Sequence, residues 1–116
     1  MYIQGVLIPV PADKQDAYRE VAEKFWPIAQ DYGALEQVEA WEADVKDGKQ
    51  TDFRRAVAAE PGEKIVFSWM TWPDKETAHR CYEKMREDPN MTGEMPFDPK
   101  RMIWGGFSPL FTMGRD

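Results

Sequence analysis

Carboxylate, guanidinium and aromatic side chains that could act on a small molecule occur in two parts of the sequence. Glu39 lies between the apolar residues Val38 and Ala40, and Asp98, Arg101 and Trp104 follow one another near the end of the chain. A buried carboxylate can act as a general base, and a guanidinium can hold an anion that forms during a reaction. We predict that Glu39 and Arg101 are catalytic and that Asp98 and Trp104 bind the ligand beside them. The competing interpretation is structural, with Arg101 in an ion pair with Asp98 or Glu39.

Three more residues are candidates for ligand binding: Trp41, Trp69 and His79. Tryptophan rings can cover an aromatic or anionic ligand, but they also pack well at protein–protein interfaces. We therefore predict that Trp41, Trp69 and Trp104 line either a ligand site or the core of a dimer. For His79 the competing interpretation is a partly exposed surface histidine with no role in binding.

Metal and cofactor sites lack the ligands they would need. The chain has one histidine, His79, and one cysteine, Cys81. A structural zinc site requires four Cys or His ligands, so this class is excluded, and we expect no metal and no cofactor. Cys81 falls on the apolar stripe of a predicted helix, where a buried and unreactive thiol is expected.

The charge pattern argues against nucleic acid and membrane partners. The net charge is −6, and lysines and arginines alternate with acids rather than clustering. Phosphate binding needs a concentrated basic surface, so nucleic acid is not an expected partner. No apolar run is long enough to span a membrane, and the N-terminus starts like a strand rather than a signal peptide. We expect a cytoplasmic protein in which residues 1–116 form one domain.

The elements that must position these side chains follow from hydrophobic periodicity and from glycine and proline. Asp13 is the expected N-cap of the first helix and Gly33 its C-cap, and Asp88-Pro89 ends the second helix. The predicted strands cover residues 2–10, 35–45, 65–72 and 101–113, and the predicted helices lie between the first and second and between the third and fourth.

This β-α-β-β-α-β order is typical of a ferredoxin-like α+β fold, with a four-stranded antiparallel sheet and both helices on one face. In the second strand Gln37, Glu39 and Trp41 should share one face. We expect the fourth strand to run beside the second, which would bring Arg101 to Glu39. The other sheet face would expose large apolar side chains, and a homodimer formed sheet against sheet would cover them.

The segment 95–107 combines two prolines, Asp98, Lys100-Arg101, Trp104 and a Gly-Gly pair. With this segment the chain resembles the DUF1428 family of small bacterial proteins. Weaker matches along the chain support the resemblance: Tyr18-Arg19-Glu20, Gly33-Ala34-Leu35, Glu39-Ala40-Trp41, Asp44-Val45, Asp47-Gly48, Phe67-Ser68-Trp69, Trp72-Pro73 and Asp88-Pro89.

The resemblance implies the dimeric α+β barrel fold and no established activity. The wider superfamily includes cofactor-free monooxygenases, haem-degrading enzymes and isomerases, whose ligands lie between the sheet and the helices. Since a fold does not define a function, three hypotheses stay open. They are a dimer that binds a small aromatic or anionic molecule, a cofactor-free monooxygenase or isomerase acting on an enolisable aromatic substrate, and a purely structural or interaction dimer.

Overall fold

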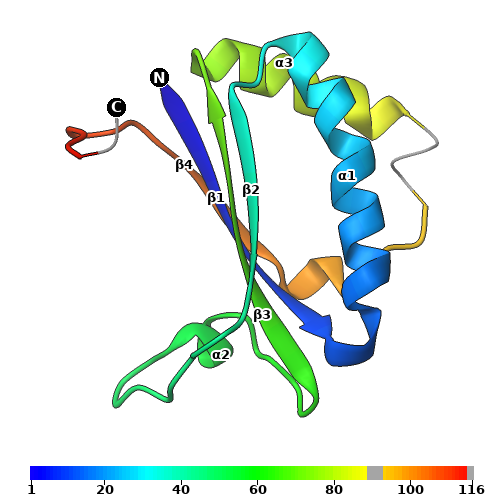
Figure 1. The fold of residues 1–116 in the computed structure, drawn as a ribbon, viewed down its shortest axis with the longest axis vertical. Helices are drawn as coiled ribbons and strands as arrows, with labels where there is room; N and C mark the ends of the chain where they lie inside the picture. The colour runs from blue at the N-terminus through cyan, green and yellow to red at the C-terminus, as the bar shows by residue number, and fades with distance from the viewer. Residues whose placement is uncertain (89–92, 115–116) are drawn as a thin grey trace.

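The computed structural model describes residues 1–88 and 93–114, and it has two layers, with an antiparallel sheet on one side and two long helices on the other (Figure 1). The predicted role of Pro89 lies outside the described residues. No helix among those residues is long and apolar enough to cross a membrane. The elements in chain order are β1 (Tyr2–Pro11), η1 (Ala12–Lys14), α1 (Gln15–Tyr32), β2 (Glu36–Trp41), α2 (Phe53–Ala56), β3 (Glu63–Trp72), α3 (Lys75–Glu87), η2 (Pro99–Arg101) and β4 (Ile103–Phe107).

The sheet has the strand order β2-β3-β1-β4, and every neighbouring pair is antiparallel. This confirms the predicted ferredoxin-like α+β fold. The expectation that the fourth strand runs beside the second is wrong, because β2 and β4 form opposite edges of the sheet. Each β-α-β crossover runs through a helix of the helical layer and skips one strand position: β3 lies between β1 and β2, and β1 lies between β3 and β4. The two crossovers therefore interlock, β1 and β3 become the central strands, and β4 joins the free edge of β1.

Residues in β3 alternate between the two faces of the sheet. Val66, Ser68, Met70 and Trp72 are buried beneath the helices, whereas Phe67 and Trp69 point to the opposite face. The Trp72 indole N–H donates to Oε1 of the buried Gln4 at 3.0 Å, so the largest core side chain leaves no polar atom unpaired. Cys81 of α3 lies in the same apolar cluster and is buried, as predicted.

The predicted helix ends are partly correct. Gly33 ends α1 with a left-handed φ of 113°, which glycine adopts without strain, and its N–H donates to the carbonyl of Gln30. Asp13 is not the N-cap of α1, because a short 3-10 turn that contains it comes first and α1 begins at Gln15. Asp74 caps α3 by accepting the Thr77 N–H at 2.7 Å.

Two strands are shorter than predicted. β2 ends at Trp41 because the next residue, Glu42, bonds to β3 through its side chain instead of its backbone. Its carboxylate accepts the Ile65 N–H of β3 at 2.9 Å and also pairs with Arg54. β4 ends at Phe107, which lies opposite Ile3, so the partner strand β1 is almost at its N-terminus there.

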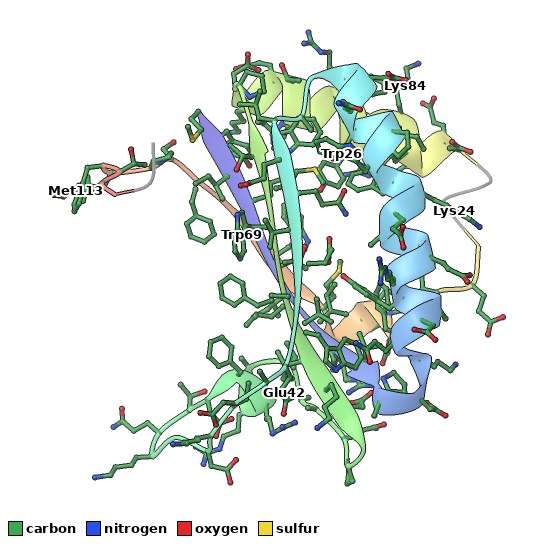
Figure 2. The ribbon with its side chains drawn as sticks, viewed as in Figure 1. Lys24, Trp26, Glu42, Trp69, Lys84 and Met113 are labelled. Carbon is green, nitrogen blue, oxygen red and sulfur yellow. The ribbon has the colours of Figure 1, made fainter. Side chains whose placement is uncertain are left out.

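The sheet face without helices is apolar. Leu7, Phe67, Trp69, Ile103 and Phe107 share it in the strand register, and Trp69 points away from the helices (Figure 2). Phe67 and Phe107 are 46% and 61% exposed, which is high for side chains of this size. The predicted apolar face is therefore present.

Candidate functional site

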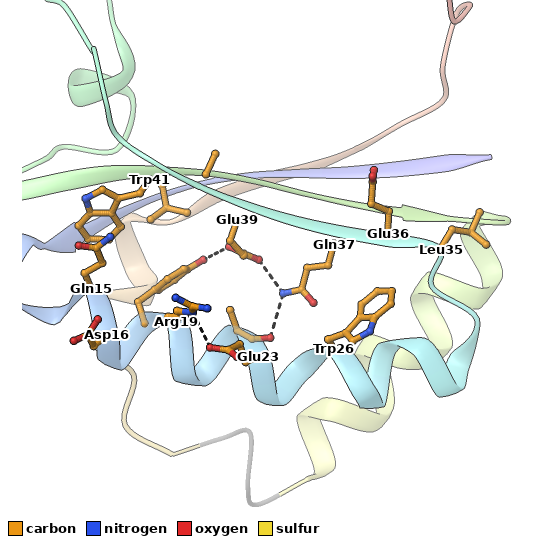
Figure 3. Close-up of a pocket in the computed structure, with 14 residues that line it drawn as sticks. Gln15, Asp16, Arg19, Glu23, Trp26, Leu35, Glu36, Gln37, Glu39 and Trp41 are labelled. Atoms are coloured by element: carbon orange, nitrogen blue, oxygen red, sulfur yellow. Dashed lines mark hydrogen bonds and ion pairs between the residues drawn. The ribbon is translucent and has the colours of Figure 1, made fainter. Parts of the chain in front are cut away.

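An open cleft of about 790 Å³ separates α1 from the β2 edge of the sheet (Figure 3). Turns of α1 form one wall, and the helix-facing side chains of β2 form the floor. Because β2 is an edge strand, the cleft opens to solvent along that edge. The lining residues are Gln15, Asp16, Tyr18, Arg19, Ala22, Glu23, Trp26, Leu35, Glu36, Gln37, Glu39, Ala40, Trp41 and Val66.

Glu39 is the centre of a hydrogen-bond network on the floor of the cleft. Its Oε1 accepts the Tyr18 hydroxyl at 2.5 Å, and its Oε2 accepts Ser68 at 2.9 Å and the Gln37 amide at 3.0 Å. Glu39 lies opposite Ser68 in the β2–β3 register, so the two side chains share the face beneath the helix. The carboxylate is thus held by donors from α1, β2 and β3.

Tyr18 donates to Glu39 from a buried position on α1. Burial raises the pKa of the Tyr18 phenol far above its ordinary value, and the neighbouring Glu39 carboxylate raises it further. The phenol therefore stays protonated at neutral pH and remains a hydrogen-bond donor.

Gln37 connects the floor of the cleft to the helix. Its Nε2 donates to the Ala22 carbonyl at 3.2 Å and to Glu39 at 3.0 Å. Two acceptors on one side of the amide identify that side as nitrogen, so the oxygen must point the other way. Oε1 is buried and has no hydrogen-bond donor among the residues that the structure describes. Figure 3 shows this oxygen on the side of Trp26.

Aromatic rings and charges line the rest of the cleft. Trp26 of α1 and Trp41 of β2 lie toward its two ends (Figure 3). Arg19 contributes the guanidinium among the lining residues, and its Nε donates to Glu23 at 2.9 Å. The cleft therefore combines indole surfaces with carboxylate and amide oxygens.

Arg101 lies in a different cluster. Its two terminal nitrogens bind the two Glu63 oxygens at 2.6 and 2.7 Å, and Nη1 also donates to the Ala58 carbonyl at 3.0 Å. Its Nε donates to Asp98 at 3.1 Å, which confirms the predicted Asp98–Arg101 pair. The predicted proximity of Arg101 to Glu39 is wrong, because the two residues have separate partners and belong to opposite edges of the sheet.

The Arg101 cluster is electrostatically matched. Hydrogen bonding to Arg101 holds the pKa of Glu63 below its ordinary value. The Lys100 N–H and then Arg101 lower the pKa of Asp98, while Glu63 and Asp98 together raise the pKa of Arg101. This group ties η2, which leads into β4, to Glu63 at the start of β3, and this is the role of a structural ion pair.

The remaining predicted ligand-binding residues do not converge. Trp69 lies on the helix-free sheet face, and Trp104 is 65% exposed at the β4 edge on the helix side. His79 is exposed on α3, where its ring packs edge-on against Tyr2. Of the predicted residues, only Glu39 and Trp41 line the cleft. Ligand binding by the other residues stays a prediction.

No group of three or more His, Cys, Asp or Glu within residues 1–88 and 93–114 could hold a metal ion. Cys81 is also not arranged as a nucleophile. Burial raises the pKa of its thiol to about 11, so the reactive thiolate is scarce at neutral pH.

Sequence reasoning missed Tyr18 and Ser68 as partners of Glu39, and it did not single out Gln37 or Trp26 as residues of the site. Part of the signal was present, since Gln37, Glu39 and Trp41 alternate on one face of their strand. Two polar residues, Gln37 and Glu39, on the helix-facing side of an edge strand indicate a place where the helices do not cover the sheet completely.

The topology and the helix packing define a ferredoxin-like α+β protein with an open cleft between its first helix and its sheet. Residues 1–99 match the family described as "Protein of unknown function (DUF1428)", and the chain belongs to this family. The chain is 54% identical over 112 residues to the uncharacterized protein YbaA of Escherichia coli strain K12 and equally to that of Shigella flexneri. Each match covers 94% of this chain and 96% of the relative.

The fold is also similar to a solved structure described as a dimeric ferredoxin-like protein from an uncultured marine organism. The TM-score is 0.60 at 7% sequence identity, and the match covers 99% of this chain and 100% of the other. Similarity at this level of identity supports the fold.

Proposed function

We propose that this protein is a homodimer in which each protomer binds a small, partly aromatic molecule in the cleft between α1 and β2. The observation that carries the proposal is the cleft itself, a volume of about 790 Å³. Pockets that bind drug-sized ligands commonly have volumes of roughly 300–1,000 Å³. Polar groups converge on its floor, and indole rings from two elements lie toward its two ends.

Dimer formation is supported by the apolar sheet face. A contiguous exposed apolar surface is typical of an association site. A second copy placed face to face would cover Phe67, Trp69 and Phe107 on both protomers, as a two-fold axis requires. The ferredoxin-like neighbour from the marine organism is described as dimeric, which favours the same assembly here. This association would leave the cleft accessible, because the cleft lies on the helix side of the sheet.

The enzymatic alternative receives less support from the geometry. A cofactor-free oxygenase or isomerase would need a base and a cation on the same substrate. Glu39 is in the cleft, but Arg101 is committed to Glu63 and Asp98. Arg19, the guanidinium at the cleft, already pairs with Glu23. The aromatic part of the predicted ligand therefore has support from Trp26 and Trp41, whereas the guanidinium that lines the cleft is shared with a carboxylate.

A cleft-filling substitution tests the proposal. Ala22 lines the cleft from α1, and Ala17 lies exposed on the same helix outside the lining. A collection of small aromatic compounds should yield ligands of the wild type that the Ala22→Phe variant binds at least about tenfold more weakly, a loss of about 1.4 kcal/mol. Ala17→Phe should bind them like the wild type. Equal affinity in all three proteins, with Ala22→Phe folded by circular dichroism, would place binding elsewhere and reject the proposal.

A further inference from the structure

We infer that the cleft between α1 and β2 selects a ligand with a protonated amine attached to an aromatic body. The inference rests on the proposed function, because it names the chemical class of the ligand for that same cleft. It replaces the aromatic or anionic ligand expected from the sequence with an aromatic cation.

Acceptors on the floor of the cleft are more available to a ligand than the donors around Glu39. The hydrogen-bond donors around Glu39 are already used: the Tyr18 hydroxyl and the Ser68 hydroxyl donate to Glu39, and the Gln37 amide donates to Glu39 and to a backbone carbonyl. What remains available around Glu39 is its Oε1, which accepts a single hydrogen bond, and the amide oxygen of Gln37. A floor made of acceptors suits a ligand that brings N–H or O–H donors.

Two hydrogen bonds fix the orientation of the Gln37 side chain. Its Nε2 cannot turn away without losing both the Ala22 carbonyl and Glu39, so Oε1 is held in place. This oxygen is buried without a donor among the described residues. A buried acceptor that lacks a partner destabilises the protein, and a ligand N–H that reaches it removes this penalty. An ammonium group has three donors, one of which could bond to Gln37 Oε1.

The charged side chains that line the cleft are mostly negative. The cleft is lined by four carboxylates, from Asp16, Glu23, Glu36 and Glu39, and by one guanidinium, from Arg19. Glu36 stands on the rim and points away from α1, while Glu23 is paired with Arg19 (Figure 3). The remaining field is negative, so a cationic ligand is attracted and an anionic ligand is repelled.

The cleft also offers aromatic surface to a ligand. Trp26 and Trp41 line the cleft from two different elements. Tryptophan is the side chain whose ring face attracts cations most strongly, and it also stacks on flat rings. Carboxylates between indole rings are therefore matched to an ammonium group that carries an aromatic ring.

Three commercial compounds of similar size separate charge from shape: 2-phenylethylamine as the cation, 2-phenylethanol as the neutral form and 3-phenylpropionate as the anion. Their affinities are measured by calorimetry on the dimeric wild type at low and at physiological salt. We expect the amine to bind about tenfold or more tightly than the alcohol, and the carboxylate to bind most weakly. Salt should weaken the binding of the amine more than that of the alcohol.

Substitutions locate the preference. Gln37→Leu removes the unpaired acceptor, and Glu23→Gln removes a carboxylate from an exposed site where folding is not at risk. Each should reduce the ratio of amine to alcohol affinity several-fold. Glu83→Gln changes the net charge by the same amount on the exposed surface of α3, outside the cleft lining, and should leave the ratio unchanged.

The outcomes are distinguishable. If the alcohol or the carboxylate binds in the cleft as tightly as the amine, this inference is overturned and the proposed cleft function stands. If Glu83→Gln lowers the ratio as much as Glu23→Gln does, the preference reflects net charge and the inference also fails. If none of the three compounds binds more tightly than about 1 mM and no compound of the aromatic collection is lost in Ala22→Phe, the proposed function fails together with the inference.

Discussion

Replacing Arg101 with alanine should destabilise the protein strongly. The Arg101 side chain is 19% exposed and makes two charge-assisted hydrogen bonds to Glu63, whose side chain is only 7% exposed. Removing the guanidinium leaves the Glu63 carboxylate and the Ala58 carbonyl without this donor. Breaking a fully buried pair costs about 3–5 kcal/mol, and the partial exposure of Arg101 reduces this, so we expect a loss of about 2–3 kcal/mol in the free energy of unfolding.

The loss should depend on pH. Arg101 holds the pKa of Glu63 below its ordinary value, so the ion pair stabilises the folded protein fully above the unfolded-state pKa of the glutamate. This contribution disappears as pH falls through the lower pKa of the folded state. The difference between wild type and Arg101→Ala should therefore be largest near pH 7 and should shrink below about pH 4.

Urea unfolding followed by circular dichroism measures both effects, at one fixed protein concentration because the stability of the proposed dimer would depend on concentration. Lys84→Ala is the control, since Lys84 pairs with Glu87 on an exposed helix surface, where such pairs contribute at most about 1 kcal/mol. A loss under about 1 kcal/mol for Arg101→Ala, or a difference from wild type that does not shrink in acid, would refute the structural role assigned to this cluster.

Three further outcomes are expected. Tyr18→Phe removes the 2.5 Å hydrogen bond to Glu39 and should lower the free energy of unfolding by about 1–2 kcal/mol; an unchanged urea midpoint would show that this bond does not stabilise the protein. Cys81 is buried and its thiol pKa is raised to about 11, so a thiol reagent should label it slowly in native protein and rapidly in denaturant, and rapid native labelling would contradict the assigned burial. Phe67→Asp puts a charge on the helix-free sheet face and should convert the proposed dimer to monomer by light scattering, whereas Trp104→Asp at the β4 edge should not; a wild-type monomer would reject the dimer itself.

The strand faces could be predicted from the sequence because side chains alternate with a period of two. The alternation from Val66 to Trp72 indicates which side chains share a face, and the same rule put Gln37, Glu39 and Trp41 together. Gly33 was also predictable, because a helix that ends in the left-handed region favours glycine.

The partners of the charged groups could not be predicted, because they depend on long-range placement. Glu63 pairs with Arg101 only because β3 starts two residues earlier than periodicity indicated and lies antiparallel to β1. Tyr18 reaches Glu39 because of the way α1 packs over β2. The error in the position of β4 moved Arg101 to the wrong edge of the sheet, and with it the predicted catalytic pair.

The central claim is that the ligand lies between Trp26 and Trp41, and the indole N–H signals of the five tryptophans test it directly. In a ¹H–¹⁵N NMR titration of the protein with 2-phenylethylamine, we predict that the signals of Trp26 and Trp41 shift together in a saturable manner. The signals of Trp72, which is buried and bonded to Gln4, and of the exposed Trp104 should stay in place. Saturable shifts confined to Trp69 or Trp104, with Trp26 and Trp41 unchanged, would contradict the account.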